Sequence, residues 1–305
     1  MNVAIKTFRR IPDFLRRRWQ WYIVHPVARR KFRKIHILDS FMSIQYIINH
    51  RCSVSRFGDG EFDLIRGASE GYQKPDAKLA DSLKMVLKAT DAPNHIVGVP
   101  YFLKNVDGTV KNTRDFWGRL VKEYGSRWIK YLSEDRLYID TQISRFYVEY
   151  HNYERSTRQL RMLKQIWQDR DVVIIEGCQS RTGVGNDLYD NARQIERILG
   201  FPKNGFSHYA EMLDAIKEYV KPEEGKLLLM SYGPTATILA YDLAKLGYQA
   251  VDIGHLDIEY EWYKRRTPKG GIVKGKYTNE AKGGDAVAEC NDSEYLSQII
   301  CNITR

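Results

Sequence analysis

Residues 227–253 have the sequence LLLMSYGPTATILAYDLAKLGYQAVDI, which points directly to a fold class. The first four residues are an uninterrupted apolar run, typical of a strand buried on both faces of a parallel sheet. A Gly-Pro pair then marks a junction from strand to helix, and the helix predicted over 235–246 ends at Gly247. Because a second strand is predicted at 250–253, the stretch indicates a strand, a helix and a strand in succession.

The same alternation continues along the rest of the chain. A clear strand is predicted at 172–175 and a weaker one at 96–99. This alternation predicts an α/β fold with a Rossmann-like, mostly parallel sheet flanked by helices, whose ligands bind beyond the carboxyl ends of the strands. The other predicted helices cover residues 37–49, 76–88, 115–132, 156–168 and 187–199.

Length and composition exclude several classes of protein. With 305 residues, of which 43% are hydrophobic, the chain is long enough to bury a large core. The four cysteines lie far apart without a C-x-x-C pair, which favours neither a zinc site nor a disulfide framework. No apolar run approaches the roughly 20 residues that cross a bilayer. We therefore expect a cytoplasmic protein in a reducing compartment.

The net charge of +10 is confined to the start of the chain. Residues 1–36 contain eleven of the 48 Lys and Arg residues and one of the 38 acids, which leaves 37 bases and 37 acids in residues 37–305. We therefore separate a basic N-terminal segment, 1–36, from a globular domain, 37–305. The globular part has neither a basic stripe nor a nucleic-acid reading motif, so nucleic acid is not an expected partner.

The basic segment has the pattern of an amphipathic helix. Apolar residues from Phe8 to Ile23 recur at three- and four-residue steps, with arginines between them. Such helices lie peripherally on anionic membrane surfaces, where each Lys or Arg contributes about 1 kcal/mol. The alternative is a helix that docks on its own domain or on a partner protein, with its arginines in solvent.

The first stretch with candidate chemistry is SRFGDGEF, residues 55–62. Asp59 and Glu61 flank a glycine before a predicted helix, and two carboxylates so spaced can face one Mg²⁺ or Mn²⁺ that also binds a diphosphate. Arg56 can donate to the same phosphates, and Gly58 allows a tight turn. The alternative requires no metal, because acids at a helix start are favoured by the helix dipole.

The second stretch is a glycine-rich turn after the strand predicted at 172–175. Its glycines match neither G-x-G-x-x-G nor the Walker A pattern, which disfavours a dinucleotide cofactor or an ATPase. Backbone N–H groups at this turn and at the helix predicted after it would form an anion site, and Arg181 supplies a positive charge. The alternative is an ordinary turn with Asn186 or Asp187 as the N-cap.

The third stretch begins after the apolar run at residues 227–230. Ser231 and Thr235 lie at the junction with the next helix, where they either contact a nucleotide or have a purely structural role. Further on, four titratable residues alternate with apolar ones and are predicted to share one face of an extended segment. The cluster is a candidate for a general base or a further metal ligand, and the alternative is an exposed acidic edge. Its members are His255, Asp257, Glu259 and Glu261.

Taken together, the three stretches resemble the bacterial GT-D-type glycosyltransferases, a family first known as a domain of unknown function. The matching segments occur in the family's order and span most of the chain from about residue 50 to residue 280. The basic segment lies outside the resemblance. The segments are SRFGDGEF at 55–62, EGCQSRTGVGNDLYDNARQIERIL at 176–199 and SYGPTATILAYDLAKLGYQAVDIGHLDIEYEW at 231–262.

The resemblance implies a Rossmann-like fold of the GT-D type, a nucleotide-sugar donor such as UDP-glucose, and Mn²⁺ or Mg²⁺ bound through a D-x-E motif. On this chain the motif is Asp59-Gly60-Glu61. If the reaction inverts configuration, a base is needed, and our candidates are Glu259, Asp257 and His255 in that order. The residues expected to bind the donor are Arg56, Gly58, Arg181, Gly183, Gly185, Asn186, Asp187, Ser231 and Thr235.

The expected function is therefore metal-dependent transfer of a hexose, first of all glucose, from a UDP-sugar to a hydroxyl of a glycan. The acceptor is lipid-linked or protein-linked, as in the assembly of cell-surface polysaccharides or glycoproteins. A membrane-bound N-terminal segment would suit a lipid-linked acceptor. Two alternatives remain: a metal-dependent phosphohydrolase or nucleotidyltransferase acting on nucleotide-sugars, and a non-catalytic basic scaffold at the membrane surface.

Overall fold

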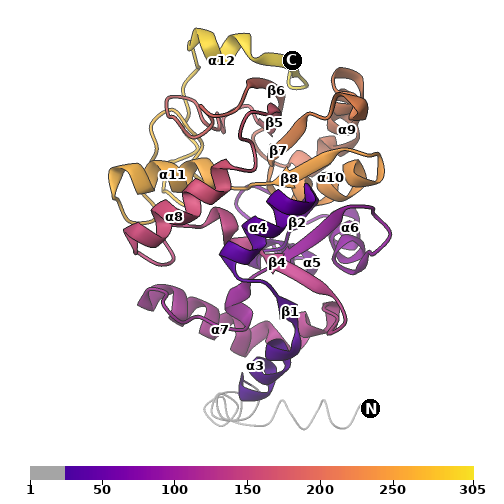
Figure 1. Ribbon diagram of the computed structural model, residues 1–305, viewed down its shortest axis with the longest axis vertical. Coiled ribbons are helices and arrows are strands. Elements are labelled where there is room, and N and C mark those ends of the chain that lie inside the picture. Colours follow the sequence, from indigo (N-terminus) through magenta and orange to yellow (C-terminus); the bar gives the residue numbers. More distant parts are fainter. Residues whose placement is uncertain (1–24) are drawn as a thin grey trace.

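The computed structural model describes residues 25–305, and within them nine strands form one sheet (Figure 1). Every pair of neighbouring strands is parallel, in the order β1-β4-β3-β2-β8-β7-β5-β6-β9. This confirms the predicted α/β fold with a mostly parallel sheet. The strands are β1 His36–Ile37, β2 Ser53–Arg56, β3 His95–Val99, β4 Leu137–Asp140, β5 Asp171–Gly177, β6 Gln194–Gly200, β7 Leu227–Ser231, β8 Gln249–Asp252 and β9 Ile299–Asn302.

Helices cover both faces of the sheet. Side chains of β5 alternate between the faces, so Val172 and Ile174 pack beneath α4, α8 and α11, whereas Val173 and Ile175 pack beneath α9 and α10. The first group of helices forms one layer and α5, α6, α9 and α10 form the other. The helices are α3 His25–Lys34, α4 Ser40–His50, α5 Asp59–Ile65, α6 Ala77–Lys88, α7 Lys111–Trp128, α8 Tyr153–Lys164, α9 Tyr209–Tyr219, α10 Gly233–Lys245, α11 Leu256–Arg265 and α12 Ser293–Ser297.

The strand–helix–strand unit at 227–253 is confirmed. Strand β7 is buried from Leu227 to Met230, α10 follows at once with Pro234 in its first turn, and β8 pairs with β7 over four residues. The weaker strand predicted at 96–99 is β3, and four of the five other predicted helices correspond to α4, α6, α7 and α8 with shifted ends. The sequence pattern therefore located four strands of the sheet, β3, β5, β7 and β8, but not β2, which lies between β3 and β8.

The helix predicted at 187–199 is wrong. Residues Gln194–Gly200 form β6, which pairs with β5 over seven residues and with β9 on its other side. The turn after β5 therefore leads through irregular structure into a strand. The turn is thus not followed by a helix N-terminus that could bind an anion.

The extended segment predicted after His255 is also wrong, because Leu256–Arg265 is the helix α11. Every residue from Leu256 to Tyr263 is buried. A helix that is buried all round has no single apolar stripe, so its sequence shows no helical period. In a helix, residues four apart share a face, so the four titratable residues divide into the pairs His255 with Glu259 and Asp257 with Glu261.

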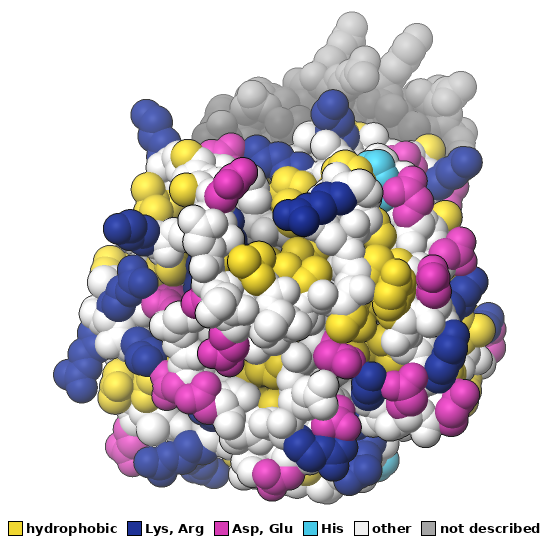
Figure 2. All heavy atoms as spheres, turned by 90° about the horizontal axis from the view of Figure 1, so that it is seen from above, with side chains coloured by type: hydrophobic (Ala, Val, Ile, Leu, Met, Phe, Trp, Pro, Cys, Tyr) yellow, Lys and Arg dark blue, Asp and Glu magenta, His cyan; other side chains and the backbone are white. Residues whose placement is uncertain are grey.

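The amphipathic pattern at Phe8 to Ile23 lies outside the described residues. The next segment, α3, packs on α7 through the buried Phe32 and Ile35, while Arg30, Lys31 and other bases of α3 face solvent. On the face seen in Figure 2, side chains of both charges are interspersed. Among residues 25–305, no helix has the length and apolar composition needed to cross a membrane.

Candidate active site

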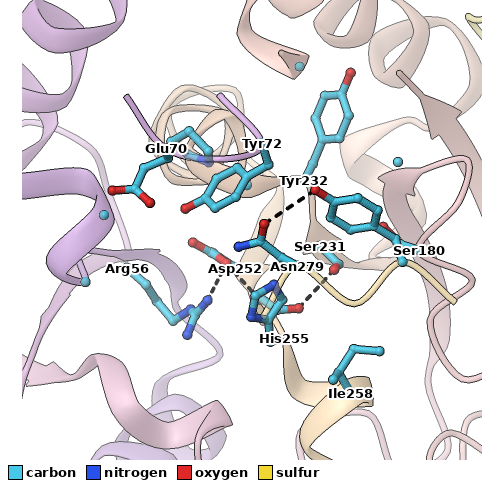
Figure 3. A pocket seen from close by; sticks show the side chains of 18 of the residues that line it. Arg56, Glu70, Tyr72, Ser180, Ser231, Tyr232, Asp252, His255, Ile258 and Asn279 are labelled. Atoms are coloured by element: carbon cyan, nitrogen blue, oxygen red, sulfur yellow. Dashed lines mark hydrogen bonds and ion pairs between the residues drawn. The ribbon is translucent and has the colours of Figure 1, made fainter. Parts of the chain in front are cut away.

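A cavity opens at the carboxyl ends of the central strands, where ligands bind on Rossmann-like sheets (Figure 3). Its walls come from the residues that follow β2, β4, β5, β6, β7 and β8, together with two loops, one before α6 and one after α11. The side chains with functional groups are Arg56, Asp59, Glu61, Glu70, Tyr72, Thr141, Gln142, Ser144, Arg145, Ser180, Thr182, Lys203, Asn204, Ser231, Tyr232, Asp252, His255, Asp257, Tyr277, Asn279 and Glu280.

The D-x-E motif lies in the first turn of α5, at the cavity wall. Gly58 is the N-cap, and its N–H donates to Oε2 of Glu61 at 2.7 Å. Burial raises the pKa of Asp59, and it raises the pKa of Glu61 to about 7, with the charge of Asp252 adding to the effect. The two carboxylates are thus held on the cavity, in surroundings that disfavour their negative charge.

A loop that the sequence did not single out adds two residues beside this motif. A Cβ built on Gly60 would be 3.1 Å from the hydroxyl of Tyr72, so a larger residue in the middle of the motif would crowd this side chain. Burial, followed by the charge of Asp59, raises the pKa of Glu70. Neither residue follows a strand, so no sequence signal marked this loop.

Arg56 joins the ends of three strands. Its Nη1 donates to the carbonyl of Thr141 at 3.1 Å and to Oγ of Ser144 at 2.5 Å, and its Nη2 lies 3.1 Å from Oδ1 of Asp252. The sequence predicted a guanidinium free to bind phosphate. Most of its donors are instead used within the protein, so its main contact with a donor would be electrostatic.

The glycine-rich turn after β5 lies partly behind the cavity. Thr182 lines the cavity, but the N–H of Thr182 donates to Glu176 and that of Gly183 donates to Asp257. The guanidinium of Arg181 is turned to two backbone carbonyls, of Gly275 and Ala288. The predicted donor-binding residues Arg181, Gly183, Gly185, Asn186 and Asp187 are not among the residues that line the cavity.

Of the two residues at the junction between β7 and α10 that were predicted to bind the donor, one lies on the cavity wall. Ser231 lines it and donates to the carbonyl of Gly254 at 2.9 Å. Thr235 is fully buried in the first turn of α10, and within the described residues its hydroxyl has no hydrogen-bond partner. Ser231 alone of this pair can therefore reach a ligand in the structure as it stands.

The three candidate bases have different surroundings. Glu259 is fully buried, and its Oε1 accepts the N–H groups of Tyr147 at 2.9 Å and Val148 at 2.7 Å. Asp257 reaches the cavity but is bonded on both oxygens. His255 lines the cavity with 32% of its side chain exposed, and burial together with the charge of Arg145 lowers its pKa to about 4. It is therefore neutral at physiological pH.

Arg145 and Glu280 form an ion pair in the cavity wall that the sequence did not indicate. Nη1 of Arg145 is 3.1 Å from Oε2 of Glu280, and Nη2 contacts the other oxygen, which gives a two-point contact. Arg145 follows β4, whose apolar residues 137–139 were the available signal. Glu280 belongs to the loop after α11, where no pattern marks it.

Carboxylates outnumber cations at the cavity. Of the described lining residues, six are acids and three are Lys or Arg. Each of the three cations already has an acidic partner: Arg56 with Asp252, Arg145 with Glu280, and Lys203 with Asp285. Three acids of the cavity form no ion pair with a described residue, and these are Asp59, Glu61 and Glu70.

Within residues 25–305, no group of three or more His, Cys, Asp or Glu side chains is arranged to hold a metal ion by itself. A cation at the D-x-E motif would thus take only one or two ligands from the protein. That is the usual arrangement for Mg²⁺, which keeps several waters and binds the phosphates of a substrate.

Comparison with known proteins gives consistent matches. A family described as glycosyltransferase GT-D fold matches residues 54–281. The probable glycosyl transferase Gly of Streptococcus gordonii is 33% identical over 279 residues, which are 92% of this chain and 40% of the relative. Glycosyltransferase GlyD of Streptococcus pneumoniae serotype 4 is 34% identical over 261 residues, 86% of this chain and 32% of the relative. The chain thus spans less than half the length of either relative.

Solved structures match over nearly their whole length. A structure of the domain of unknown function 1792, described as having a distinct glycosyltransferase fold, superposes with a TM-score of 0.85 at 34% identity, covering 91% of this chain and 99% of that chain. A second structure, described as a new glycosyltransferase from Streptococcus sanguinis, has a TM-score of 0.81 at 34% identity, covering 88% of this chain and 99% of that chain.

Proposed function

This chain belongs to the glycosyltransferase family with the GT-D fold, and from that membership we propose that it transfers a hexose from a UDP-sugar to a hydroxyl of a glycan, with Mn²⁺ or Mg²⁺ as cofactor. The observation that supports the cofactor most directly is the unpaired set of carboxylates at the cavity wall. A nucleotide diphosphate is an anion, and a cavity with more acids than bases repels it unless a cation is bound.

The chain's residues fit such a cation. Asp59 and Glu61 offer the carboxylate oxygens that Mg²⁺ and Mn²⁺ prefer, and both lie at the cavity without an ion-pair partner among the described residues. A divalent cation there would neutralise the diphosphate of the departing nucleotide. Arg145 would add positive charge from the cavity wall, and the hydroxyl oxygen of Ser231, whose proton is donated to Gly254, can accept a hydrogen bond from the donor at the end of β7.

For the base, the geometry favours His255 over the order expected from sequence. An imidazole that is neutral at pH 7 can accept the proton of an attacking hydroxyl, and His255 is exposed to the cavity. Asp257 and Glu259 are less suitable, because their carboxylates already accept hydrogen bonds from buried groups. We therefore propose His255 as the acid–base residue of an inverting reaction.

The acceptor we propose is a lipid-linked or protein-linked glycan of cell-surface polysaccharide or glycoprotein assembly. The basic N-terminal segment supports a peripheral position on the cytoplasmic face of the membrane, because α3 continues its charge with the exposed Arg30, Lys31, Arg33 and Lys34. Sedimentation with vesicles of anionic and of neutral lipid tests this position. Equal binding to both vesicles, or none, would contradict it.

The activity is tested by nucleotide release from a panel of UDP- and GDP-sugars with Mn²⁺. We expect hydrolysis of one UDP-sugar, with loss of activity on chelation and in Asp59→Asn and Glu61→Gln. The matched control is Asp63→Asn, which removes an acid of the same helix that pairs with Arg66 outside the cavity, and which should retain activity.

The products separate the rival functions. Release of UDP and free sugar supports glycosyl transfer, whereas release of UMP and a sugar phosphate would indicate a phosphohydrolase. If there is no turnover and no metal-dependent nucleotide binding, the remaining function is that of a scaffold at the membrane surface. Its binding to anionic vesicles should persist in Asp59→Asn and Glu61→Gln and be lost when residues 1–36 are removed.

A further inference from the structure

A long strap without helix or strand covers one side of the cavity. It comprises residues 266–292, between α11 and α12, and its Tyr277, Asn279 and Glu280 form part of the cavity wall. Irregular segments of this length are uncommon within compact domains and are often functional. What holds the strap in place therefore determines the shape of the cavity on this side.

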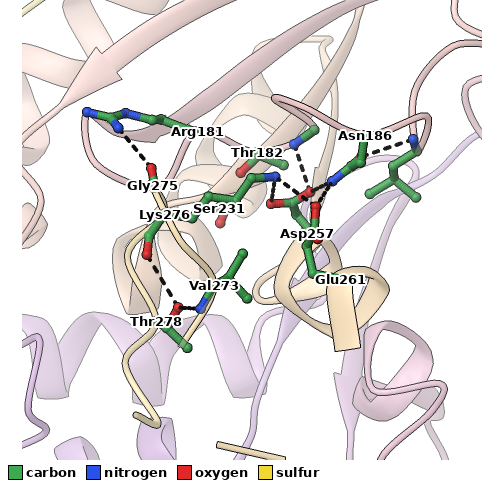
Figure 4. Close-up of polar contacts among 12 residues, drawn as sticks. Arg181, Thr182, Asn186, Ser231, Asp257, Glu261, Val273, Gly275, Lys276 and Thr278 are labelled. Atoms are coloured by element: carbon green, nitrogen blue, oxygen red, sulfur yellow. Dashed lines mark hydrogen bonds and ion pairs between the residues drawn. The ribbon is translucent and has the colours of Figure 1, made fainter. Parts of the chain in front are cut away.

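The residue next to this wall, Lys276, is buried in a cluster of ion pairs with α11 (Figure 4). Its Nζ is 2.6 Å from Oδ2 of Asp257 and 3.7 Å from Oε1 of Glu261, and the side chains of all three residues are less than a tenth exposed. Asp257 and Glu261 lie one helical turn apart, so they present both carboxylates to the same ammonium.

The rest of the cluster makes this contact rigid. Asn186 donates through Nδ2 to Asp257 at 2.8 Å and to Glu261 at 2.7 Å, and the N–H of Gly183 donates to Asp257 at 2.9 Å. Asp257 thus accepts three hydrogen bonds in all, which leaves little of its accepting capacity for a substrate proton. The cluster has the features of a structural anchor rather than of a proton acceptor.

Other contacts hold the strap on either side of the anchor. The N–H of Tyr277 donates to the carbonyl of Gln179 at 2.8 Å, and Arg181 donates to the carbonyl of Gly275 at 2.8 Å. Glu280 pairs with Arg145, but a ligand in the cavity can compete for that arginine. Among the ion pairs that the strap forms with described residues, those of Lys276 are the most buried.

We propose that Lys276 is a positioning residue for glycosyl transfer: its ion pairs with Asp257 and Glu261 anchor the strap to α11 and so place Tyr277 and Asn279 against the nucleotide-sugar donor. This inference rests on the proposed function, because it assigns the strap wall to the donor. Loss of the anchor lets the wall move, which weakens donor binding while leaving the reacting groups on the other strand ends intact.

The test compares Lys276→Met with Lys276→Arg, which keeps the charge, and with Lys274→Met, which removes an exposed lysine of the same strap. Two properties are measured: the Kd for UDP with Mn²⁺, and the rate of trypsin cleavage at Lys269 and Lys282, located by mass spectrometry. We expect Lys276→Met to raise the Kd and the KM for the donor about tenfold or more, with a smaller change in kcat. Strap cleavage should accelerate, and the pH profile of kcat should stay as in the wild type.

Lys276→Arg should recover most of the affinity, and Lys274→Met should match the wild type. In the double variant Lys276→Met with Asp257→Asn, the increases in Kd should be far from additive, because both changes release the same anchor. An unchanged Kd in folded Lys276→Met, or a loss of kcat at unchanged Kd, would overturn the inference. Absence of nucleotide binding in the wild type would refute the proposed function instead, and unchanged strap cleavage would still refute the anchor.

Discussion

Arg56 and Gly254 are in contact at the centre of the cavity: a Cβ built on Gly254 would lie 1.8 Å from Nη2 of Arg56. Gly254 also has a φ of +47°, which residues with a side chain rarely adopt. The same Nη2 forms the ion pair with Asp252. The glycine is therefore needed for the position of the arginine as well as for the turn.

Gly254→Ala should displace Arg56 and open the junction of β2, β4 and β8. The variant should lose nucleotide affinity as well as stability, measured by UDP binding and by Tm. Gly108→Ala is the matched control, because Gly108 has a φ of +75° and, within the described chain, no atom near its added Cβ. The control should show only the backbone strain, about 1 kcal/mol. Equal effects in the two variants would contradict the role given to the contact.

His255 should remain neutral throughout the physiological range. Burial and the charge of Arg145 lower its pKa to about 4, so its imidazole NMR signals should show no titration between about pH 6 and 8. Arg145→Met should raise the pKa, because it removes the cation that disfavours protonation. A wild-type midpoint near the ordinary value of about 6.5 would contradict the surroundings described for this residue.

Glu259 should make folding stability depend on pH. Burial raises its pKa to about 7, against the opposing effects of Arg145 and of two backbone N–H groups. The folded carboxyl then holds its proton more tightly than the unfolded chain does, where the pKa is about 4.3. Its contribution to stability is complete below about pH 4 and is lost as the pH rises through about 7.

Glu259→Gln should remove this contribution. The difference in Tm between wild type and variant should therefore change between about pH 5 and 7.5 and be flat above that range. Glu154→Gln, at an exposed position of α8, should follow the wild type across the whole range. A difference between wild type and Glu259→Gln that does not change from about pH 5 to 7.5 would show that this carboxyl is ionised throughout this range and that its pKa is not raised.

The sequence predicted those elements whose local pattern of apolar residues matches their burial in the folded protein. Strands β5 and β7 lie in the interior of the sheet and are apolar on both faces, so their composition alone marks them. The segment 187–199 is different, because Leu188, Ala192, Ile195 and Leu199 recur at helical spacing. Residues 187–193 form turns and bends, and residues 194–199 become part of β6 through pairing with β5, an interaction with another strand that overrides propensity.

The site shows the same division. Ser231 lies at the end of a strand that the pattern located, Asp59 and Glu61 were marked by their spacing around a glycine, and all three line the cavity. Arg145 follows β4, a strand that was not predicted, and Tyr277 and Glu280 belong to the strap. The strap is held by ion pairs of Lys276 with Asp257 and Glu261 of α11, which lie 19 and 15 positions earlier in the chain, and no local pattern encodes such contacts.

The connection from β5 to β6 should depend on a single buried ion pair. Oε1 of Glu176 is 2.6 Å from Nη1 of Arg197, and Oε2 accepts the N–H of Thr182 at 2.7 Å. Both charged side chains are almost completely buried, at 0% and 3% exposure. Removing one partner leaves the other charge without compensation, which costs about 3–5 kcal/mol in comparable cases.

Arg197→Met and Glu176→Gln should each lower the free energy of unfolding by an amount of this order, measured by urea denaturation. The matched control lies on the same two strands, where Arg193 pairs with Asp171 at the exposed end, with Nε 2.6 Å from Oδ1. Asp171→Asn should cause a much smaller loss, because solvent screens that pair. The double variant Arg197→Met with Glu176→Gln should be more stable than the sum of its single effects predicts, since it leaves neither charge unpaired. Additive losses would show that the two residues act independently, and the turn would then have to be held by its other hydrogen bonds.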